Sequence, residues 1–468
     1  MERTLIRDLH DHIDTEVLVN GWVSVRRDHG KLIFLDIRDR SGIVQAVALP
    51  NNEGVVETAD TLRPEYVVAV TAKVNARPEK MVNEDEQNGD IELELLSITT
   101  LNESKTPPFE LTEDTSDIEE TLRLKYRYLD LRTERMQRNI KVRSEFIQRC
   151  RDFLFERDFT EIETPLLTES TAEGSRDFVV PSRINPGKFY ALPQSPQQYK
   201  ELLMTAGFER YFQIARAIRD EDLRADRGFE HTQLDLEISF MNQEDIMQLI
   251  ENMMTTVVEA MGHTIKEKPF PVISYQDAME KYGADKFDLR TEEDKQNNVL
   301  AFAWVVDFPL FEKTDEGAWT FSHNPFSLPK PEYQEAHLAG KDTENIISTQ
   351  YDLVCNGFEV GGGSLRAYDP QTLTATYKTM GYSEEEIERM VGHMREAYSF
   401  GTPPHGGLAL GIERNIMNLV GEDALREVQA FPMTRGGQTS VMNGPSELSK
   451  EQLKELRLSI NEKEKDGD

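Results

Sequence analysis

The strongest constraint on the fold is a change of hydrophobic pattern near residue 102. Before it, five short apolar segments are separated by Gly, Asn, Pro or acidic clusters. The segments span residues 16–23, 31–39, 42–49, 65–74 and 90–101. Apolar runs of this length between turn residues are typical of β-strands. Five strands in a small domain suggest a closed barrel, and the OB-fold is the five-stranded one. The strand count alone leaves a generic β-barrel equally open.

After residue 102 the pattern predicts a second kind of domain. Residues 102–120 are acidic and Pro-containing, as is typical of an interdomain linker. Apolar residues then recur at helical spacing in 143–159, and further helices are expected within 242–262 and 383–398. Strands between them do not alternate regularly with helices. This favours an α+β fold with an antiparallel sheet over a doubly wound sheet.

Composition limits the classes of function. The net charge of −32 argues against general attraction to nucleic acid, although local basic surfaces remain open. The longest apolar run, 299–306, is too short to span a bilayer, and the first residues lack an apolar signal region. Two cysteines provide neither a disulfide framework nor metal-ligand spacing. We therefore expect a cytoplasmic protein without membrane association.

A charged stretch before an alternating apolar run, at 218–240, is the first candidate site. It contains charges of both signs at Arg219, Glu221, Arg224, Asp226, Arg227 and Glu230. An ATP site needs cations for phosphates, carboxylates for Mg²⁺ and a flat side chain for adenine, and one hairpin here could supply all three. Neither a Walker-type loop nor a strand-linked GxGxxG is present, which weakens P-loop and Rossmann interpretations.

Three other regions place polar residues and glycines beside apolar strands. They lie at 171–200, 321–368 and 402–420. Taken singly, each fits surface ion pairs or tight loops. Taken in order with the charged stretch, they resemble the motifs of class II aminoacyl-tRNA synthetases, and specifically of bacterial-type aspartyl-tRNA synthetases.

The resemblance extends over nearly the whole chain. The helix from Arg143 through "TPLL" is similar to motif 1, 212–240 to motif 2, and 407–414 to motif 3. Residues 21–45 and 122–132 are similar to the family's anticodon-binding barrel and hinge. The resemblance implies an aspartate–tRNA ligase that activates L-aspartate with ATP and transfers it to tRNA-Asp. Motif 1 also implies a homodimer.

The resemblance implies a domain organisation. We expect an OB-fold anticodon-binding domain at 1–103, a hinge or linker at 104–138, a class II catalytic domain at 139–446 and a tail at 447–468 that begins as a helix. Bacterial members carry an inserted domain between motifs 2 and 3. Here only a short polar link near 287–300 crosses that point, so the insertion is inferred to be absent.

The resemblance also assigns roles in ATP binding and catalysis. ATP contacts are expected from Arg219, Glu221, Arg227, His231, Glu359, Gly411, Ile412, Glu413 and Arg414. Arg219, Glu221 and Arg414 are the expected catalytic residues, with Arg219 on the α-phosphate and Arg414 near the γ-phosphate. Asp352 and Glu359 are expected to bind Mg²⁺.

The expected aspartate pocket contains two cations. The resemblance assigns it Glu173, Ser195, Gln197, Lys200, Arg219, Asp235, His323 and Arg366. Arg366 and Lys200 would hold the side-chain carboxylate. Because asparagine is nearly isosteric with aspartate, it would leave these buried cations unpaired, a defect that supports discrimination of ~10⁴. This favours aspartyl over asparaginyl or lysyl specificity.

The barrel is expected to read the tRNA anticodon. The resemblance implies that Phe34 stacks on a base and that Arg27, Gln45 and Glu92 bond base edges, as in recognition of unpaired RNA. The strand pattern alone would instead put Phe34 in the core. A His at the position of His29 accompanies relaxed tRNA choice in relatives, which would add tRNA-Asn. An exposed loop residue is the alternative interpretation of His29.

Several positions depart from the family pattern, and alternative functions stay open beside the aspartate–tRNA ligase. Gly228 and His231 stand where the family has a side chain near adenine and a stacking Phe. Asn324 replaces a His, and Glu413 replaces an Asp. The alternatives are a non-catalytic tRNA-binding paralog, an asparaginyl-tRNA synthetase and a synthetase-like asparagine synthetase. The last would be expected to lack the N-terminal barrel.

Overall fold

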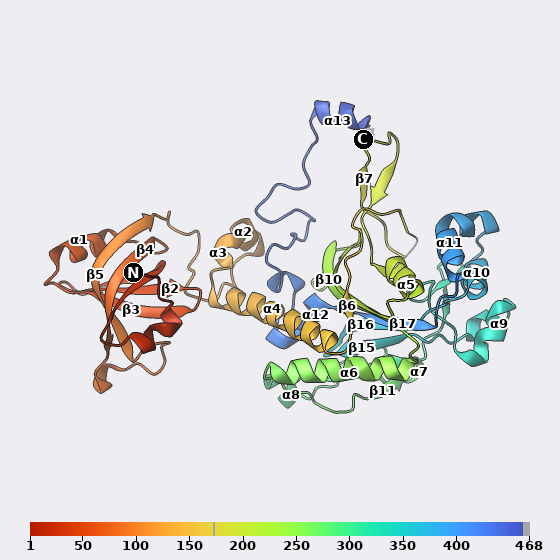
Figure 1. Cartoon of the computed structure of the whole chain (residues 1–468), viewed down its shortest axis with the longest axis horizontal. Helices are drawn as coiled ribbons and strands as arrows, with labels where there is room; N and C mark the ends of the chain where they lie inside the picture. The colour runs from red at the N-terminus through yellow and green to blue at the C-terminus, as the bar shows by residue number, and fades with distance from the viewer. Residues whose placement is uncertain (172–173, 462–468) are drawn as a thin grey trace, which may run out of the picture. The chain divides into compact units, whose positions relative to one another are not determined.

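The computed structural model describes residues 1–171 and 174–461. It contains two compact units, Met1–Arg135 and Met136–Asp468 (Figure 1). No helix among the described residues is long and apolar enough to cross a bilayer.

The first unit is a closed five-stranded barrel in the order β1-β2-β3-β5-β4. Its strands are β1 (Glu16–Asp28), β2 (Ile33–Asp39), β3 (Gly42–Ala48), β4 (Val67–Ala76) and β5 (Ile91–Asn102). Neighbours are antiparallel except β3 and β5, which are parallel. Helix α1 (Glu53–Thr61) connects β3 to β4. The five predicted strands and the OB-fold barrel are confirmed.

The segment after the barrel is more ordered than a flexible linker. Helices α2 (Glu120–Lys125) and α3 (Arg127–Asp130) follow it. The fully buried carboxylate of Asp130 bonds to Arg127 at 2.6 Å and accepts from the Thr115 hydroxyl at 2.6 Å. A buried carboxylate needs such partners, so these contacts anchor the segment to the helices.

The second unit is built on an eight-stranded sheet in the order β11-β12-β15-β16-β17-β10-β9-β6. The strands are β6 (Thr160–Glu161), β9 (Arg210–Ile218), β10 (Glu230–Ser239), β11 (Val272–Ser274), β12 (Phe302–Val306), β15 (Tyr351–Cys355), β16 (Phe358–Leu365) and β17 (His405–Gly411). The central strands β12 to β9 pair antiparallel, and only the edge strands β11 and β6 pair parallel. This confirms the predicted α+β class with an antiparallel sheet. Two small hairpins join β7 (Val179–Pro181) to β8 (Phe189–Ala191), and β13 (Phe311–Lys313) to β14 (Trp319–Phe321).

Helices flank this sheet. They are α4 (Glu134–Phe155), α5 (Gln197–Thr205), α6 (Gln243–Ala260), α7 (Tyr275–Tyr282), α8 (Glu292–Gln296), α9 (Gln334–Leu338), α10 (Pro370–Thr379), α11 (Glu384–Tyr398), α12 (Ile412–Val420) and α13 (Lys450–Leu456). The described part of the chain also has five 3₁₀ turns, at Ile6–His12, Glu79–Met81, Pro331–Tyr333, Thr343–Asn345 and Leu425–Glu427. The predicted polar link near 287–300 contains α8, whose N-cap Thr291 forms a capping box with Asp294.

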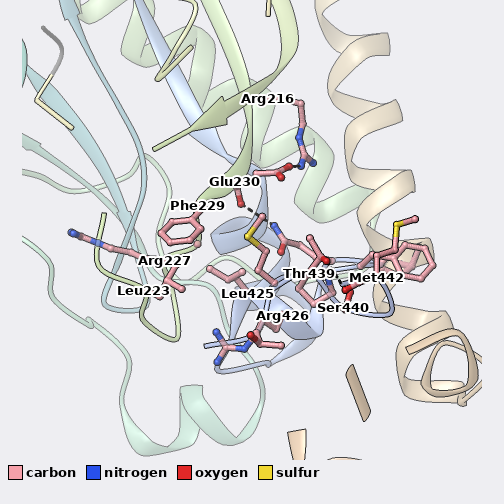
Figure 2. Close-up of a pocket in the computed structure, with 18 of the residues that line it drawn as sticks. Arg216, Leu223, Arg227, Phe229, Glu230, Leu425, Arg426, Thr439, Ser440 and Met442 are labelled. Atoms are coloured by element: carbon pink, nitrogen blue, oxygen red, sulfur yellow. Dashed lines mark hydrogen bonds and ion pairs between the residues drawn. The ribbon is translucent and has the colours of Figure 1, made fainter. Parts of the chain in front are cut away.

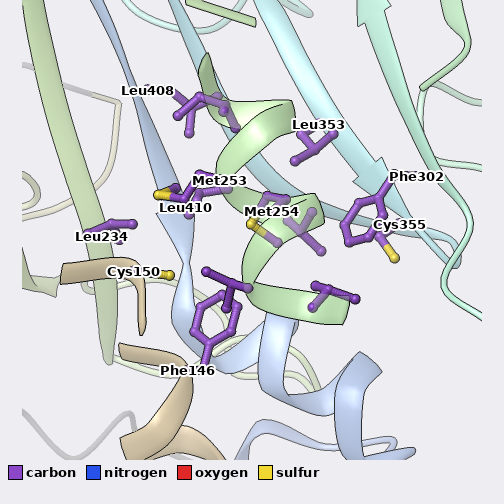
Figure 3. Close-up of a cluster of buried hydrophobic side chains, with 14 of the residues drawn as sticks. Phe146, Cys150, Leu234, Met253, Met254, Phe302, Leu353, Cys355, Leu408 and Leu410 are labelled. Carbon is purple, nitrogen blue, oxygen red and sulfur yellow. The ribbon is translucent and has the colours of Figure 1, made fainter. Parts of the chain in front are cut away.

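One face of the sheet packs against α4 and α6 (Figure 3). Met253 and Met254 of α6 lie against Leu408 and Leu410 of β17, and Phe146 of α4 joins the same cluster. Burial of these side chains drives the sheet and the two helices together. Since residues along a strand alternate between faces, the opposite face is left for polar groups.

Candidate active site

The charged stretch forms the turn of a hairpin. Strands β9 and β10 pair from Ile218 opposite Glu230, and the charged loop 219–229 lies between them. The other neighbour of β10 is β17, which ends at Gly411 opposite Gln233. Helix α12 begins at the next residue, so Arg414 in its first turn lies beside the hairpin. Two segments far apart in the sequence are thus joined by strand pairing.

A cavity of about 180 Å³ opens at this junction. It is lined by Arg219, Glu221, Asp226, Arg227, Gly228, His231, Gln233, Glu359, Val360, Gly361, Ala409, Gly411, Glu413, Arg414 and Leu425. Every residue expected to contact ATP lines it except Ile412, which is fully buried in the core. Gln233 was not predicted, although it lies two residues before Asp235 on the same face of β10. Its buried Oε1 has no hydrogen-bond partner in the described structure.

The cations of this cavity contact loop carboxylates and main-chain oxygens. Arg414 donates to Asp226 at 3.1 Å and to the main-chain oxygen of Glu359 at 2.9 Å. Arg219 donates to the Gln194 main-chain oxygen at 3.2 Å. The carboxylate of Glu221 lies 3.5 Å from Arg227. Asp226 was not predicted to have a role of its own, because only the fold brings it to Arg414.

His231 is a neutral ring in this setting. Burial, together with the nearby charges of Arg219 and Arg414, lowers the pKa of His231 to about 3, against the opposing effect of the Glu413 carboxylate. A neutral imidazole presents a flat face without a competing charge. His231 could therefore stack on adenine, the role expected of the aromatic residue at this position in the family.

A second, larger cavity of about 530 Å³ lies beside the first (Figure 2). The two share Arg227, Gly228 and Leu425. Apolar side chains such as Phe229 and Met442 and several paired arginines line it; Arg216, for example, bonds to Glu230. A Cβ at Gly228 would approach nothing closer than 3.4 Å. This glycine is therefore not required by packing, and it leaves space between the cavities.

Next to the cavity that contains Arg219 and Arg414 lies a buried charge cluster. The alternation of β10 puts Leu234, Leu236 and Ile238 in the core and leaves Asp235 and Glu237 on the other face, toward α5. Lys200 of α5 bonds to Asp235 at 2.9 Å and to Glu237 at 3.1 Å. All three side chains are at most 2 % exposed. Burial raises the pKa of Asp235 to about 6, against the opposing effect of Lys200.

Arg366 belongs to the same cluster and already has a carboxylate partner. Its Nε bonds to Glu237 at 2.9 Å and its Nη1 to the Ser364 hydroxyl at 2.9 Å. Two longer contacts, both 3.4 Å, join Nη2 to Glu237 and to the Gly407 main-chain oxygen. Glu237 was not predicted, and it gives both buried cations, Lys200 and Arg366, a carboxylate partner within the chain. A guanidinium has five N–H groups, and these four contacts leave at least one for a ligand.

Gly407 allows strand β17 to lie close to the Glu237 carboxylate. A Cβ there would overlap the Glu237 carboxylate and the Leu236 main-chain oxygen. Only a residue without a side chain lets β17 pass this close to Glu237.

A second layer of contacts holds Gln197. Its amide nitrogen donates to Glu201, which also accepts from the Tyr398 hydroxyl. The main-chain N–H of Gln197 donates to Ser195 Oγ at 3.2 Å. Glu201 is fully buried and was not predicted, since nothing local distinguishes it from an exposed helical Glu. Glu173 lies outside the described residues.

The two carboxylates expected to bind Mg²⁺ lie on adjacent strands, β15 and β16. Asp352 is 2 % exposed, bonds to Gln350 and lies 3.3 Å from His323 Nε2. Burial and the charge of Glu359 raise the pKa of Asp352. Among the described residues, no group of three or more His, Cys, Asp or Glu side chains could hold a metal alone. Two mutually repelling carboxylates fit Mg²⁺, which usually takes one or two carboxylates plus substrate phosphates.

The five barrel residues expected at the anticodon lie on or beside one outer face. Phe34 is opposite Arg27 in the β1–β2 register, and Asp36 is opposite Gln45. Arg27 bonds to Asp36 at 2.6 Å and to Gln45 at 3.1 Å, and Gln45 donates to Glu92 at 2.7 Å. These contacts put Arg27, Gln45 and Glu92 in one hydrogen-bonded row.

Phe34 itself is not a core residue. Ile33, Leu35 and Ile37 face the barrel interior, and the half-buried Phe34 faces outward. Exposed His29 meets the Phe34 ring edge-on at 5.5 Å between centroids. The barrel arginines have acidic neighbours: Arg26 pairs with Asp60, and Arg38 pairs with Glu65 at 2.9 Å.

Two family models match this chain, one for each unit. Residues 119–435 match the model of the class II tRNA synthetases (D, K and N). The chain belongs to this family. Residues 17–101 of this class II synthetase also match an OB-fold nucleic acid binding domain.

Individual relatives of the synthetase are similar over most of its length. It is 38% identical to the aspartate–tRNA(Asp/Asn) ligase of Rubrobacter xylanophilus, over 96% of this chain and 95% of that protein. It is 38% identical to the aspartate–tRNA ligase of Listeria welshimeri, over 97% of each chain. The first alignment spans 573 positions, more than the 468 residues here, so the relative has stretches without a counterpart.

Solved structures share the fold. Asparaginyl-tRNA synthetase from Pyrococcus horikoshii, complexed with asparaginyl-adenylate, superposes with a TM-score of 0.74 at 24% identity, covering 93% of this chain and 98% of that one. Aspartyl-tRNA synthetase from Entamoeba histolytica gives 0.73 at 21% identity, covering 92% and 91%. At such identities the likeness concerns the fold alone.

Proposed function

We propose that this class II synthetase is an aspartate–tRNA ligase. It would activate L-aspartate with ATP and transfer the aspartyl group to the 3′ end of tRNA-Asp. The observation that carries the proposal is the junction of two sites: a cavity lined by both Arg219 and Arg414 lies beside a buried cluster containing Lys200 and Arg366. The names of the relatives, aspartate–tRNA ligases at 38% identity, support the same function.

The first step needs no side-chain nucleophile. The α-carboxylate of aspartate attacks the α-phosphorus of ATP in line, forming the acyl–phosphate bond of aspartyl-adenylate as the bond to pyrophosphate breaks. Arg219 would offset charge on the α-phosphate and Arg414 charge on the departing pyrophosphate. In the second step, the 3′-hydroxyl of the terminal adenosine of tRNA attacks the activated carbonyl, and AMP leaves.

Recognition of aspartate would use the buried cluster. A side-chain carboxylate would join Glu237 on Arg366 and Lys200 and accept their remaining N–H groups. The amide of asparagine would turn N–H donors toward the same cations and leave their remaining N–H groups without an acceptor, which is costly in a buried site. Asp235, with Ser195 and Gln197, would face the α-ammonium group. We assign Glu173 and His323 to the same pocket on the family pattern alone.

Mg²⁺ is proposed as the metal, held by Asp352 and Glu359 with the phosphates of ATP. When bound it would neutralise phosphoryl charge. Here this chain supplies only the two carboxylates, and His323 beside Asp352 would hold that side chain in place.

The barrel is proposed to bind the anticodon through Phe34, Arg27, Gln45 and Glu92, and the choice of tRNA to include tRNA-Asn through His29. Relatives at 38% identity are named both aspartate–tRNA(Asp/Asn) ligase and aspartate–tRNA ligase, so their names leave the choice to experiment. A homodimer and a cytoplasmic location complete the proposal.

One experiment tests the function and its breadth. Purified protein is assayed for aspartate-dependent ATP–pyrophosphate exchange and for charging of purified tRNA-Asp and tRNA-Asn. We expect exchange with aspartate and not with asparagine, and charging of both tRNAs. Exchange with asparagine alone would refute the pocket assignment, and no exchange with any amino acid would favour a non-catalytic paralog. Charging restricted to tRNA-Asp would reject the role of His29.

A further inference from the structure

Lys286, which has not been assigned a role so far, contacts a residue that lines the nucleotide cavity. It follows α7 in the chain and precedes the short link that contains α8. Its Nζ is 2.9 Å from Oε2 of Glu359, which lines the cavity. The side chains of Lys286 and Glu359 are 37% and 31% exposed, so this ion pair is partly open to solvent, and one of its members lines the cavity.

Glu359 is held between two cations. Arg414 Nη1 donates to the main-chain oxygen of Glu359 at 2.9 Å and lies 4.0 Å from the same Oε2 that Lys286 contacts. Arg414 is the residue proposed to meet the γ-phosphate side of ATP. Lys286 therefore lies across one carboxylate from a proposed phosphate-binding arginine.

The chemistry of the ligand would redistribute these contacts. If the Glu359 carboxylate were to bind Mg²⁺, its oxygen would attract the Lys286 ammonium less strongly than it does now. Lysine is a compact charge on a flexible stem, and it binds phosphates as a point charge. With the site loaded, the anions nearest to a displaced Lys286 would be the β- and γ-phosphates beside Arg414.

We propose that Lys286 is a further ATP-binding residue, which moves from Glu359 to the β,γ-phosphates of ATP and then holds the pyrophosphate leaving group. This inference rests on the proposed function. If Lys286 only paired with Glu359, its replacement would leave the affinities for phosphate ligands unchanged. It would also change stability little, because a half-exposed ion pair contributes little to the folded state.

The test compares Lys286→Met with Lys281→Met in the full-length protein. Lys281 is an exposed residue of α7, so its replacement makes the same charge change a few residues away and outside the cavity. Calorimetry measures the affinities for Mg·ATP, for Mg·pyrophosphate and for L-aspartate. We expect Lys286→Met to weaken both phosphate ligands about tenfold or more, the loss typical of a charged hydrogen bond. Aspartate affinity and all affinities of Lys281→Met should stay unchanged, and Lys286→Arg should restore part of the loss.

Two results would overturn the proposal. Unchanged affinities for Mg·ATP and Mg·pyrophosphate would leave Lys286 as a surface partner of Glu359. Tighter binding in Lys286→Met would mean that Lys286 only competes with the metal. A thermal melt of each variant checks folding, and Lys286→Gln serves if the Met variant does not fold.

Failure of the proposed function gives a different signature. If the wild-type protein shows no aspartate-dependent exchange, the function itself is refuted. If the wild type exchanges and Lys286→Met binds both phosphate ligands normally, only the role of Lys286 is refuted.

Discussion

Asp235 is the residue whose charge state most directly controls the proposed pocket. It is 1% exposed and bonds to Lys200 at 2.9 Å. Burial raises the pKa of its carboxyl from 3.8 to about 6. Because the folded-state pKa exceeds the ordinary value, this group favours the folded state most at pH below 3.8. That contribution is lost as the pH rises through about 6.

The first prediction is a loss of aspartate use in acid. A protonated Asp235 cannot pair with the α-ammonium group, so kcat/KM for aspartate should fall about tenfold per pH unit below pH 6. The measurement is the pH profile of aspartate-dependent ATP–pyrophosphate exchange. A flat profile from pH 7 to 5 would contradict this assignment.

The second prediction concerns the contribution of His231 to ATP binding. Since the ring is neutral near pH 7, its contribution to ATP should be stacking, and His231→Ala should weaken ATP binding about tenfold. His231→Phe keeps a flat face and should retain wild-type affinity. Equilibrium titration with ATP measures both. Equal losses in the two variants would show that the imidazole nitrogens, not its face, make the contact.

At the scale of elements, strand β10 connects core and site. Its alternate residues Leu234 and Leu236 pack under the sheet, while Asp235 and Glu237 face α5 and Arg366. Any shift of register by one residue would exchange these faces. Pairing with β9 and β17 on both sides prevents such a shift.

This geometry predicts different outcomes for two changes at Arg366. Arg366→Ala leaves Glu237 buried with only Lys200, and should lower the free energy of unfolding by about 3–5 kcal/mol. Arg366→Lys keeps a charge but loses the planar fork, so aspartate activation should fall at least a hundredfold with a smaller loss of stability. Denaturant unfolding and exchange kinetics measure the two effects. Full activity in the lysine variant would remove Arg366 from aspartate recognition.

At the scale of the molecule, the two units predict a division of labour. The barrel carries Phe34 and the row of Arg27, Gln45 and Glu92, while the nucleotide cavity and the charge cluster lie entirely in the second unit. The net charge of −32 makes such local recognition necessary, because the chain as a whole repels RNA.

Phe34→Ala tests this division. Loss of one stacked base should lower kcat/KM for tRNA about tenfold to a hundredfold. ATP–pyrophosphate exchange, which needs no tRNA, should be unchanged. Ile43→Ala, at an exposed apolar position in the same barrel, is the matched control. If exchange falls together with tRNA charging, the roles of the units are not separate.

The local pattern of the sequence was sufficient for much of the fold. Short apolar runs between turn residues predicted the five barrel strands, and helical spacing predicted α4, α6 and α11. The charged stretch predicted a hairpin with a polar turn, and the structure has it at β9–β10. Such signals are carried by neighbouring residues, so they survive without knowledge of the tertiary structure.

Which charges meet was decided only by the tertiary structure. Glu237 and Arg366 are 129 positions apart, and they pair because β16 and β10 both lie next to β17. The same applies to Asp226 with Arg414 and to Lys286 with Glu359. The outward direction of Phe34 also depended on which face of β2 closes the barrel. By itself, the sequence determined where strands, helices and charged loops occur, because those depend on local periodicity. Strand order determined which carboxylate neutralises which cation, because ion pairing depends on distance in space.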